Sequence, residues 1–227
     1  TNTSILGCLS RVVGVVTSVS PSEADKSAGY THGYVMALQN ASTSAAWSNS
    51  TSYDEVLQNH YTQTYDKFIT YKDGRLKTDT IVSLGLAKQT YSATTYPAHY
   101  AAVNFSGTVA VPTGCSHWYL PSIGQMYDVA VNLCDLTKTP SDPTDEGYCY
   151  WNGTSSAAAT ALSVYMTKVS SNGGTATGFT NSDEVYWTSS EYNSSGAYGL
   201  YFYSGGNLGL NLDYKTYAYR VRPFLAF

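Results

Sequence analysis

Between residues 200 and 212, large apolar side chains occupy every second position on either side of a turn. Leu200 and Phe202 precede residues 204–207, whose sequence Ser-Gly-Gly-Asn is typical of a tight turn, and three further leucines follow it. Because successive side chains of a strand point to opposite faces, this pattern predicts an antiparallel hairpin with one buried face and one exposed face.

The parity of this hairpin decides which of its side chains could meet a ligand. If Leu208, Leu210 and Leu212 point into the core together with Leu200 and Phe202, the residues between them point outward. The opposite parity would expose three leucines, an apolar patch of the kind that marks a protein partner. We favour leucines inside, which predicts an outward set of Tyr201, Tyr203, Asn207, Gly209, Asn211 and Asp213.

Helical spacing of apolar residues is found in two other segments. Ser122 can cap a helix over residues 123–133, and apolar side chains repeat at helical intervals over residues 155–170, before a glycine-containing stretch at 171–175. The remaining predictions are strands at 4–19, 34–39 and 218–227, a helix at 79–89, and a helix or long irregular segment at 53–71.

The composition of the chain excludes several classes of function. A length of 227 residues suits one large domain with its own core, and we expect a single domain over residues 1–227. Charged residues make up 12% of the chain, about half of the usual share of roughly 25%, and the net charge is −4. These values argue against nucleic-acid binding, which needs clustered Lys and Arg. No apolar run reaches the length of about 18 residues that a membrane span needs.

Tyrosine is the residue type that stands out, with 22 copies beside abundant Ser, Thr, Asn and Gly. Tyr provides contact area and a hydroxyl at low cost in conformational entropy, while Ser, Gly and Asn adapt to a partner. The composition therefore fits a recognition surface. It fits equally a β-rich secreted protein whose tyrosines lie on strands.

Neither the cysteines nor the acidic residues predict a metal centre. The four cysteines allow three disulfide pairings, and buried free thiols remain the alternative. No spacing among them is typical of zinc ligands. An acidic loop at residues 140–147 could hold calcium through its carboxylates, but a solvated loop is the favoured interpretation. The residues concerned are Cys8, Cys115, Cys134 and Cys149 for the thiols, and Asp142, Asp145 and Glu146 for the carboxylates.

Three motifs in a fixed order carry a resemblance to a known family. They are residues 118–122, Trp-Tyr-Leu-Pro-Ser; residues 186–191, Tyr-Trp-Thr-Ser-Ser-Glu; and residues 220–227, Arg-Val-Arg-Pro-Phe-Leu-Ala-Phe. Together they resemble C-type-lectin-like domains that include surface and fimbrial proteins of gut bacteria. The same family includes variable proteins of diversity-generating retroelements in bacteria and phages, and its fold is related to that of formylglycine-generating enzymes. The resemblance implies an α+β, C-type-lectin-like fold with two helices and C-terminal antiparallel hairpins.

The motif residues are suited to a scaffold. Trp118 and Trp187 are large side chains that we expect in the core. Residues 189–191, Ser-Ser-Glu, can satisfy neighbouring backbone groups, and Arg220 and Arg222 can hold carboxylates or carbonyls.

Residues 192–219 lie between two of these motifs and have an unusual composition. The window contains two charged residues, Asp213 and Lys215, where an average share of about 25% would give about seven. Seven of the 22 tyrosines fall in it, and Glu, Gln, Trp and Met are absent. Adenine-directed mutagenesis of Asn codons cannot produce Glu, Gln, Trp, Met or Lys, so the resemblance implies a retroelement-diversified window in which Lys215 is unmutated. A Tyr- and Gly-rich hairpin of accidental composition is the alternative.

The formylglycine-generating enzymes of the related fold use a cysteine pair late in the chain. Here no cysteine follows Cys149 and no histidine follows His117, so the C-terminal region lacks a nucleophile and a base. We therefore expect a protein that is not an enzyme and needs no metal and no cofactor.

The leading prediction is a ligand-binding domain, an adhesin or receptor-binding protein, on a bacterial cell surface or a phage virion. Its partner would be a protein or glycan on another cell or host surface. The alternatives are a non-diversified structural fimbrial or surface subunit and a divergent enzyme of the formylglycine-generating type. The predicted ligand-binding residues are Tyr192, Asn193, Tyr198, Tyr201, Tyr203, Asn207, Asn211, Asp213, Tyr214, Tyr217 and Tyr219.

Overall fold

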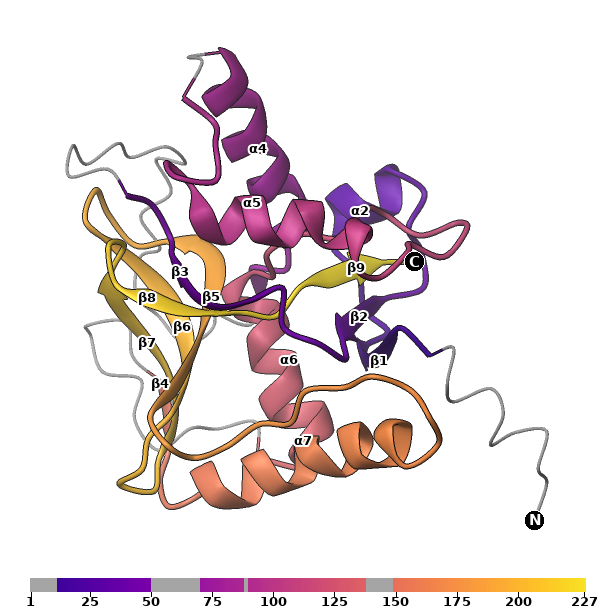
Figure 1. Cartoon of the computed structure of the whole chain (residues 1–227), viewed down its shortest axis with the longest axis vertical. Helices are drawn as coiled ribbons and strands as arrows, with labels where there is room; N and C mark the ends of the chain where they lie inside the picture. Colours follow the sequence, from indigo (N-terminus) through magenta and orange to yellow (C-terminus); the bar gives the residue numbers. More distant parts are fainter. Residues whose placement is uncertain (1–11, 50–69, 88–89, 138–148) are drawn as a thin grey trace.

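The protein has an α+β fold with two β-sheets, and one helix contacts strands of both sheets (Figure 1). The computed structural model describes residues 12–49, 70–87, 90–137 and 149–227. The helices are α2 (Glu23–Ser27), α4 (Gly74–Ala87), α5 (Pro97–Val103), the 3-10 helix η2 (Asn104–Gly107), α6 (Ile123–Leu133) and α7 (Ser155–Ser170). The strands are β1 (Gly14–Ser18), β2 (Tyr34–Ala37), β3 (Ser42–Ala46), β4 (Cys149–Trp151), β5 (Glu184–Glu191), β6 (Gly196–Phe202), β7 (Leu208–Tyr214), β8 (Ala218–Val221) and β9 (Phe224–Ala226).

The larger sheet has six strands in the order β3-β8-β5-β6-β7-β4, and the smaller sheet has the order β1-β2-β9. All pairings are antiparallel except the contact of β5 with β8. Helix α6 contacts strands of both sheets and α7 packs along the lower end of the larger one, whereas α4 and α5 lie at the other end (Figure 1). One face of the larger sheet is therefore covered by α6 and α7.

The predicted hairpin and its parity are confirmed. Strands β6 and β7 pair with Leu200 opposite Leu210 and Phe202 opposite Leu208, and these four side chains are fully buried. Leu212, near the end of the hairpin, is partly buried against the same core. The leucines thus face α6 and α7, and the intervening residues lie on the other face of the sheet.

Both predicted helices are confirmed as α6 and α7. Ser122 caps α6 in a capping box, in which its Oγ accepts a hydrogen bond from the Gln125 amide while the Gln125 side chain accepts one from the Ser122 amide. The helix predicted at 79–89 is present but begins earlier, at Gly74.

The prediction of one final strand over 218–227 is wrong. The segment forms two strands, β8 and β9, which belong to different sheets. Pro223 lies between them and has no backbone N–H, so it cannot continue a ladder of hydrogen bonds. Arg222, beside it, is buried and donates to the carbonyls of Ala37 and Thr177, which fixes the crossing between the sheets.

The scaffold roles predicted for the three motifs are confirmed. Trp118 and Trp187 are fully buried, and the Trp187 Nε1–H donates to the Ala45 carbonyl at 3.0 Å. Ser190 Oγ accepts a hydrogen bond from the Ile123 amide, and Arg220 pairs with Glu184.

Other predictions are tested only in part. Strand β1 covers residues 14–18 of the strand predicted at 4–19, and the rest of that prediction before Val12 lies outside the described residues. The segment at 53–69, Cys8 and the acidic loop also lie outside them. The three remaining cysteines, Cys115, Cys134 and Cys149, are free thiols.

Candidate functional site

Six tyrosines form a continuous tract on the face of the larger sheet that α6 and α7 leave uncovered. Neighbouring ring centroids lie 5.3–6.2 Å apart along the whole series, within the range of favourable aromatic contacts. We call this series the tyrosine tract. In order of contact its members are Tyr150 on β4, Tyr203 and Tyr201 at the end of β6, Tyr219 on β8, Tyr217 in the turn before β8, and Tyr214 at the end of β7.

Two glycines let the tyrosine rings lie close against the sheet. A Cβ on Gly209 would stand 2.7 Å from ring atoms of Tyr150, and a Cβ on Gly199 would stand 3.3 Å from the ring of Tyr201. Gly209 is the direct cross-strand partner of both Tyr150 and Tyr201. The alternation of glycine and tyrosine on neighbouring strands therefore shapes the tract.

Replacing Gly209 with alanine is expected to lower the free energy of unfolding by about 1–2 kcal/mol, because the Tyr150 ring must move away from the new methyl group. Urea unfolding followed by circular dichroism measures the change. Gly205→Ala is the matched control, since a Cβ there meets no atom within 4 Å in the same hairpin. Equal stabilities of the two variants would contradict this account of the tract.

A cavity of about 300 Å³ opens beside the middle of the tract, at the ends of β5, β6 and β7. Asp213 lies at its centre and accepts hydrogen bonds from the hydroxyls of Tyr219, at 2.5 Å, and Tyr201, at 3.3 Å. The Asn211 amide donates to the Tyr203 hydroxyl at 2.8 Å. The cavity is lined by Asp183, Glu184, Val185, Tyr201, Phe202, Tyr203, Asn211, Asp213 and Tyr219.

Two more carboxylates belong to the wall of the cavity. Glu184 is buried and pairs with Arg220 at 2.5 Å, so its charge is balanced. Asp183 is exposed and accepts hydrogen bonds from the amide and the hydroxyl of Ser204, which hold the pKa of its carboxyl below the ordinary value. Asp183 has φ 56°, a left-handed conformation that Asp adopts more readily than most residues. This conformation brings the start of β5 to the β6–β7 turn.

The tyrosines of the cavity are neutral hydrogen-bond donors. Burial raises the pKa of the Tyr201 and Tyr219 hydroxyls far above their ordinary value, and the negative charge of Asp213 acts in the same direction. The pKa of Tyr203 is raised by burial as well. The phenols thus keep their protons and the carboxylate remains the acceptor at the centre of the site.

The second charge of the 192–219 window has a different role. Lys215 is buried and pairs with the buried Glu191. Its ammonium group also donates to the Ser194 carbonyl at 3.1 Å and lies 4.7 Å from the Trp47 ring centroid. Lys215 therefore fastens the turn that carries Tyr214 and Tyr217 to the scaffold.

The structure brings together seven of the eleven residues predicted to bind a ligand. Five line the cavity, and the tract continues from them into Tyr217 and Tyr214, which are 47% and 58% exposed. The expectation that Tyr201 is exposed is wrong. It points outward as predicted but is only 5% exposed, because Tyr203, Tyr219 and Asp213 surround it.

The other four predicted residues lie elsewhere. Tyr198 shares the parity of Leu200 and is fully buried in the core. Tyr192 packs its ring on Tyr198 at 5.7 Å. Asn193 and Asn207 hold turns: Asn193 Oδ1 accepts from the amides of residues 195 and 196, and Asn207 Oδ1 accepts from the amide of residue 153. The contacts of these four residues are with the core and with turns.

Sequence reasoning missed Tyr150, Asp183 and Glu184. Tyr150 lies between two buried residues of β4, Cys149 and Trp151, and this alternation was a signal for an outward tyrosine. Asp183 and Glu184 are separated from the second motif by Val185. Only the pairing of the strands shows that they lie beside the hairpin turn.

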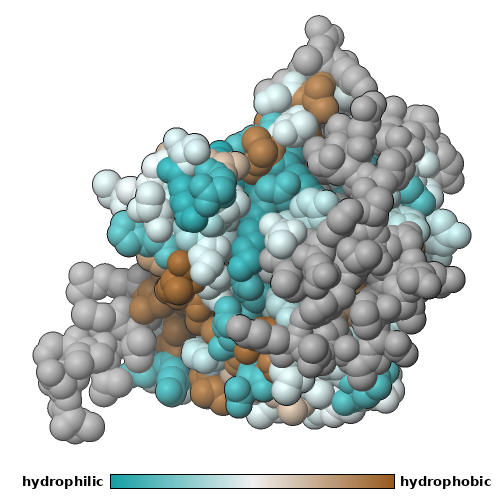
Figure 2. Space-filling view, turned by 180° about the vertical axis from the view of Figure 1, so that it is seen from behind, coloured by the Kyte–Doolittle hydropathy of each residue, from teal (hydrophilic) through white to brown (hydrophobic). Residues whose placement is uncertain are grey.

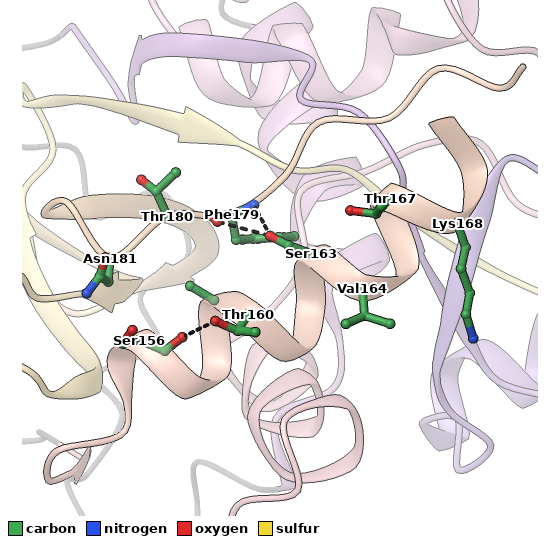
Figure 3. A pocket seen from close by; sticks show the side chains of 10 residues that line it. Ser156, Thr160, Ser163, Val164, Thr167, Lys168, Phe179, Thr180 and Asn181 are labelled. Carbon is green, nitrogen blue, oxygen red and sulfur yellow. Dashed lines mark hydrogen bonds between the residues drawn. The ribbon is translucent and has the colours of Figure 1, made fainter. Parts of the chain in front are cut away.

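A second cavity, of about 540 Å³, lies along the outer side of α7 (Figure 3). Small and hydroxyl side chains line it, and Ser163 joins its two walls through hydrogen bonds with the backbone of Phe179. Its lining contains no carboxylate, imidazole or thiol, and its one charged side chain is Lys168. The hydroxyls of its lining therefore have no carboxylate or imidazole beside them within that lining.

Exposed apolar side chains are also found around β1. Val12, Val16 and Val19, on and beside β1, are exposed. Seen from behind, hydrophobic side chains gather at the lower left of Figure 2, the side on which Figure 1 places β1 and β2 once it is turned. No helix among the described residues is long and apolar enough to cross a membrane, and no group of three potential ligands in the same part of the chain could hold a metal ion.

Comparisons with known proteins identify a solved structure with a similar fold. No family model matches the chain, and no curated protein resembles it significantly in sequence. Among solved structures, the chain is similar to a fimbrial protein from Bacteroides ovatus, with a TM-score of 0.63 and 17% sequence identity. The match covers 96% of this chain but only 44% of the fimbrial protein. At this identity the comparison shows that the α+β fold is shared by a part of that protein.

Proposed function

We propose that the chain is a domain of a bacterial cell-surface subunit of the fimbrial type. The observation that carries this proposal is the shared fold with the Bacteroides ovatus fimbrial protein over 96% of the chain. The low share of charged residues and the exposed valines of β1 support it. Strand β1 lies at the edge of the smaller sheet, where an apolar strand can pair with another subunit.

Labelling of intact cells tests the surface proposal. An antibody against the chain should bind intact producing cells, and brief protease treatment should remove its signal while a cytoplasmic marker stays intact. A protein that is labelled only after lysis would sink the proposal.

A second function, ligand binding through the tyrosine tract, is favoured by the cavity at its centre. Exposed aromatic rings beside a few convergent polar groups are typical of binding sites. The carboxylates of this cavity are held by Arg220 and by hydrogen bonds from Ser204 and the tyrosines, and its lining has no thiol or imidazole. We therefore propose a binding role and not a catalytic one, toward a protein or glycan on another surface.

Paired substitution of two tyrosines of the tract tests this second function. Tyr203→Ala with Tyr217→Ala is expected to reduce binding to intact epithelial cells or to a printed glycan array at least tenfold, because the tract loses one ring that lines the cavity and one exposed ring outside it. Tyr100→Ala removes an exposed tyrosine of α5, 37% exposed, and should leave binding unchanged. Retained binding by a folded double variant would place the site elsewhere.

We propose further that the domain is C-type-lectin-like and that its window is diversified by a retroelement. The arrangement of the window supports this: its outward positions carry Tyr, Asn, Gly and Asp, whereas Lys215 is a buried anchor that cannot vary without cost. A near-identical template repeat and a reverse transcriptase gene beside the coding sequence would establish diversification. Their absence would favour a structural subunit with a fixed surface.

A further inference from the structure

The central cavity offers a ligand mostly oxygen lone pairs. Its hydroxyl protons from Tyr201 and Tyr219 are already donated to Asp213, and the Asn211 amide is donated to Tyr203. The two donors of Ser204 are likewise directed to Asp183. The Tyr203 hydroxyl keeps its own proton and the Asn211 amide has a second N–H, but oxygen lone pairs outnumber these donors, so the cavity favours a ligand with hydrogen-bond donors of its own.

The charges of the cavity favour a positively charged ligand. Of its three carboxylates, Glu184 is balanced by Arg220, whereas Asp183 and Asp213 have no ion-pair partner among the described residues. Their hydrogen bonds come from hydroxyls and backbone amides. Both carboxylates attract a positive charge, and the partly buried Asp213, beside the aromatic wall, is screened less by water than the exposed Asp183.

The rings provide surfaces that suit a cation. Tyr201 and Tyr203 are stacked with 17° between their planes, Tyr219 stands at 72° to Tyr201, and all three rings line the cavity. The face of an aromatic ring attracts a cation, and a phenol that donates its proton to a carboxylate becomes richer in electrons. A volume of about 300 Å³ has room for a single cationic group with its nearest carbon atoms.

We propose that this cavity binds a cationic group, an ammonium or a guanidinium, presented by the ligand of the tyrosine tract. The inference rests on the proposed binding function and adds the chemical class of the group that fills the cavity. The group would lie against the rings of Tyr203 and Tyr219 and donate to Asp213. Lys and Arg side chains of a protein surface carry such a group, whereas a choline headgroup carries the positive charge without an N–H donor.

Isothermal titration of the full chain with small probes tests the inference. The probes are Nα-acetyl-arginine amide, Nα-acetyl-lysine amide and choline, with methyl glucoside as the neutral probe, all at about 20 mM salt, where screening is weak. Saturable binding of at least one cation is expected, with no binding of methyl glucoside. Raising the salt concentration to about 300 mM should weaken cation binding severalfold.

Asp213→Asn is the decisive variant, because the amide oxygen can still accept from Tyr201 and Tyr219 while the charge is lost. It should weaken cation binding at least tenfold. Glu23→Gln removes the same charge from an exposed pair on α2 and should have no effect. Tyr203→Leu should also weaken binding, since it removes one aromatic wall. Equal thermal unfolding of the variants and the parent chain excludes a folding defect.

The outcomes of these titrations test the chemical class of the ligand separately from the proposed binding function. Preference for Nα-acetyl-arginine amide or Nα-acetyl-lysine amide identifies a protein ligand, and preference for choline identifies a headgroup. Binding of methyl glucoside without binding of any cation overturns the inference and leaves the binding function in place. Failure of all four probes also overturns it, and the cell-binding assay of the tyrosine double variant then decides the function separately.

Discussion

Lys215→Met is expected to lower the free energy of unfolding by about 3–5 kcal/mol, the usual effect of removing one partner from a buried ion pair. The substitution removes the cation that pairs with the Glu191 carboxylate, which is 2% exposed. It also removes the hydrogen bond to the Ser194 carbonyl and the cation above the Trp47 ring. Chemical unfolding in urea, followed by tryptophan fluorescence, measures the change.

Two further variants identify the cause. Lys215→Met combined with Glu191→Leu should recover much of the loss, because no unpaired charge then remains buried. Lys26→Met, which breaks the exposed pair with Glu23, should change stability by less than about 1 kcal/mol. A loss below about 1 kcal/mol for Lys215→Met itself would show that the turn does not depend on this anchor.

Acidification is expected to destabilise the protein through His99. The imidazole is fully buried between Trp47 and Tyr96, and burial lowers its pKa from 6.5 to about 3, with the charge of Lys215 acting in the same direction. Between these pH values the unfolded chain binds a proton that the folded chain does not. The stabilisation is therefore complete above about pH 6.5 and is lost as the pH falls toward 3, by up to about 1.4 kcal/mol per pH unit.

His99→Phe isolates this contribution, because phenylalanine keeps the aromatic packing and cannot be protonated. Asp73, whose pKa is raised to about 6 by burial, gains a proton on folding and opposes the loss in part of the same range, so the difference between parent and variant is the informative quantity. Urea unfolding at pH 7, 6, 5 and 4 should show a smaller decline for His99→Phe. His32→Asn, on the surface, is the control, and parallel declines for all three proteins would contradict the assignment.

Local patterns in the sequence predicted the hairpin, α6 and α7, because alternation and capping residues act within a few positions. They failed at Pro223, where the direction of the chain depends on two sheets at once. They also did not predict which tyrosines of the tract are buried. Parity places Tyr201 on the outer face, but its burial depends on Tyr219 and Asp213, which reach it only through the pairing of strands.

The residues of the candidate site likewise divide into those that local sequence patterns predict and those that depend on the three-dimensional structure. The composition of the sequence indicates its tyrosines, and Asp213 is one of the two charged residues of the 192–219 window. Asp183 was not visible, because its role follows from a left-handed backbone conformation and from Ser204, 21 positions away. The sequence predicts that Lys215 does not vary. Its buried ion pair with Glu191 would make a substitution at this position costly in stability.

The hydrogen bonds that join Tyr201 and Tyr219 to Asp213 are present before any ligand arrives. Most of the rotational freedom of these side chains is thus lost during folding and need not be lost again on association. Association with the proposed ligand would then require little rearrangement. Variants of the outward positions should consequently differ from one another mainly in how long the complex survives, and much less in how quickly it forms.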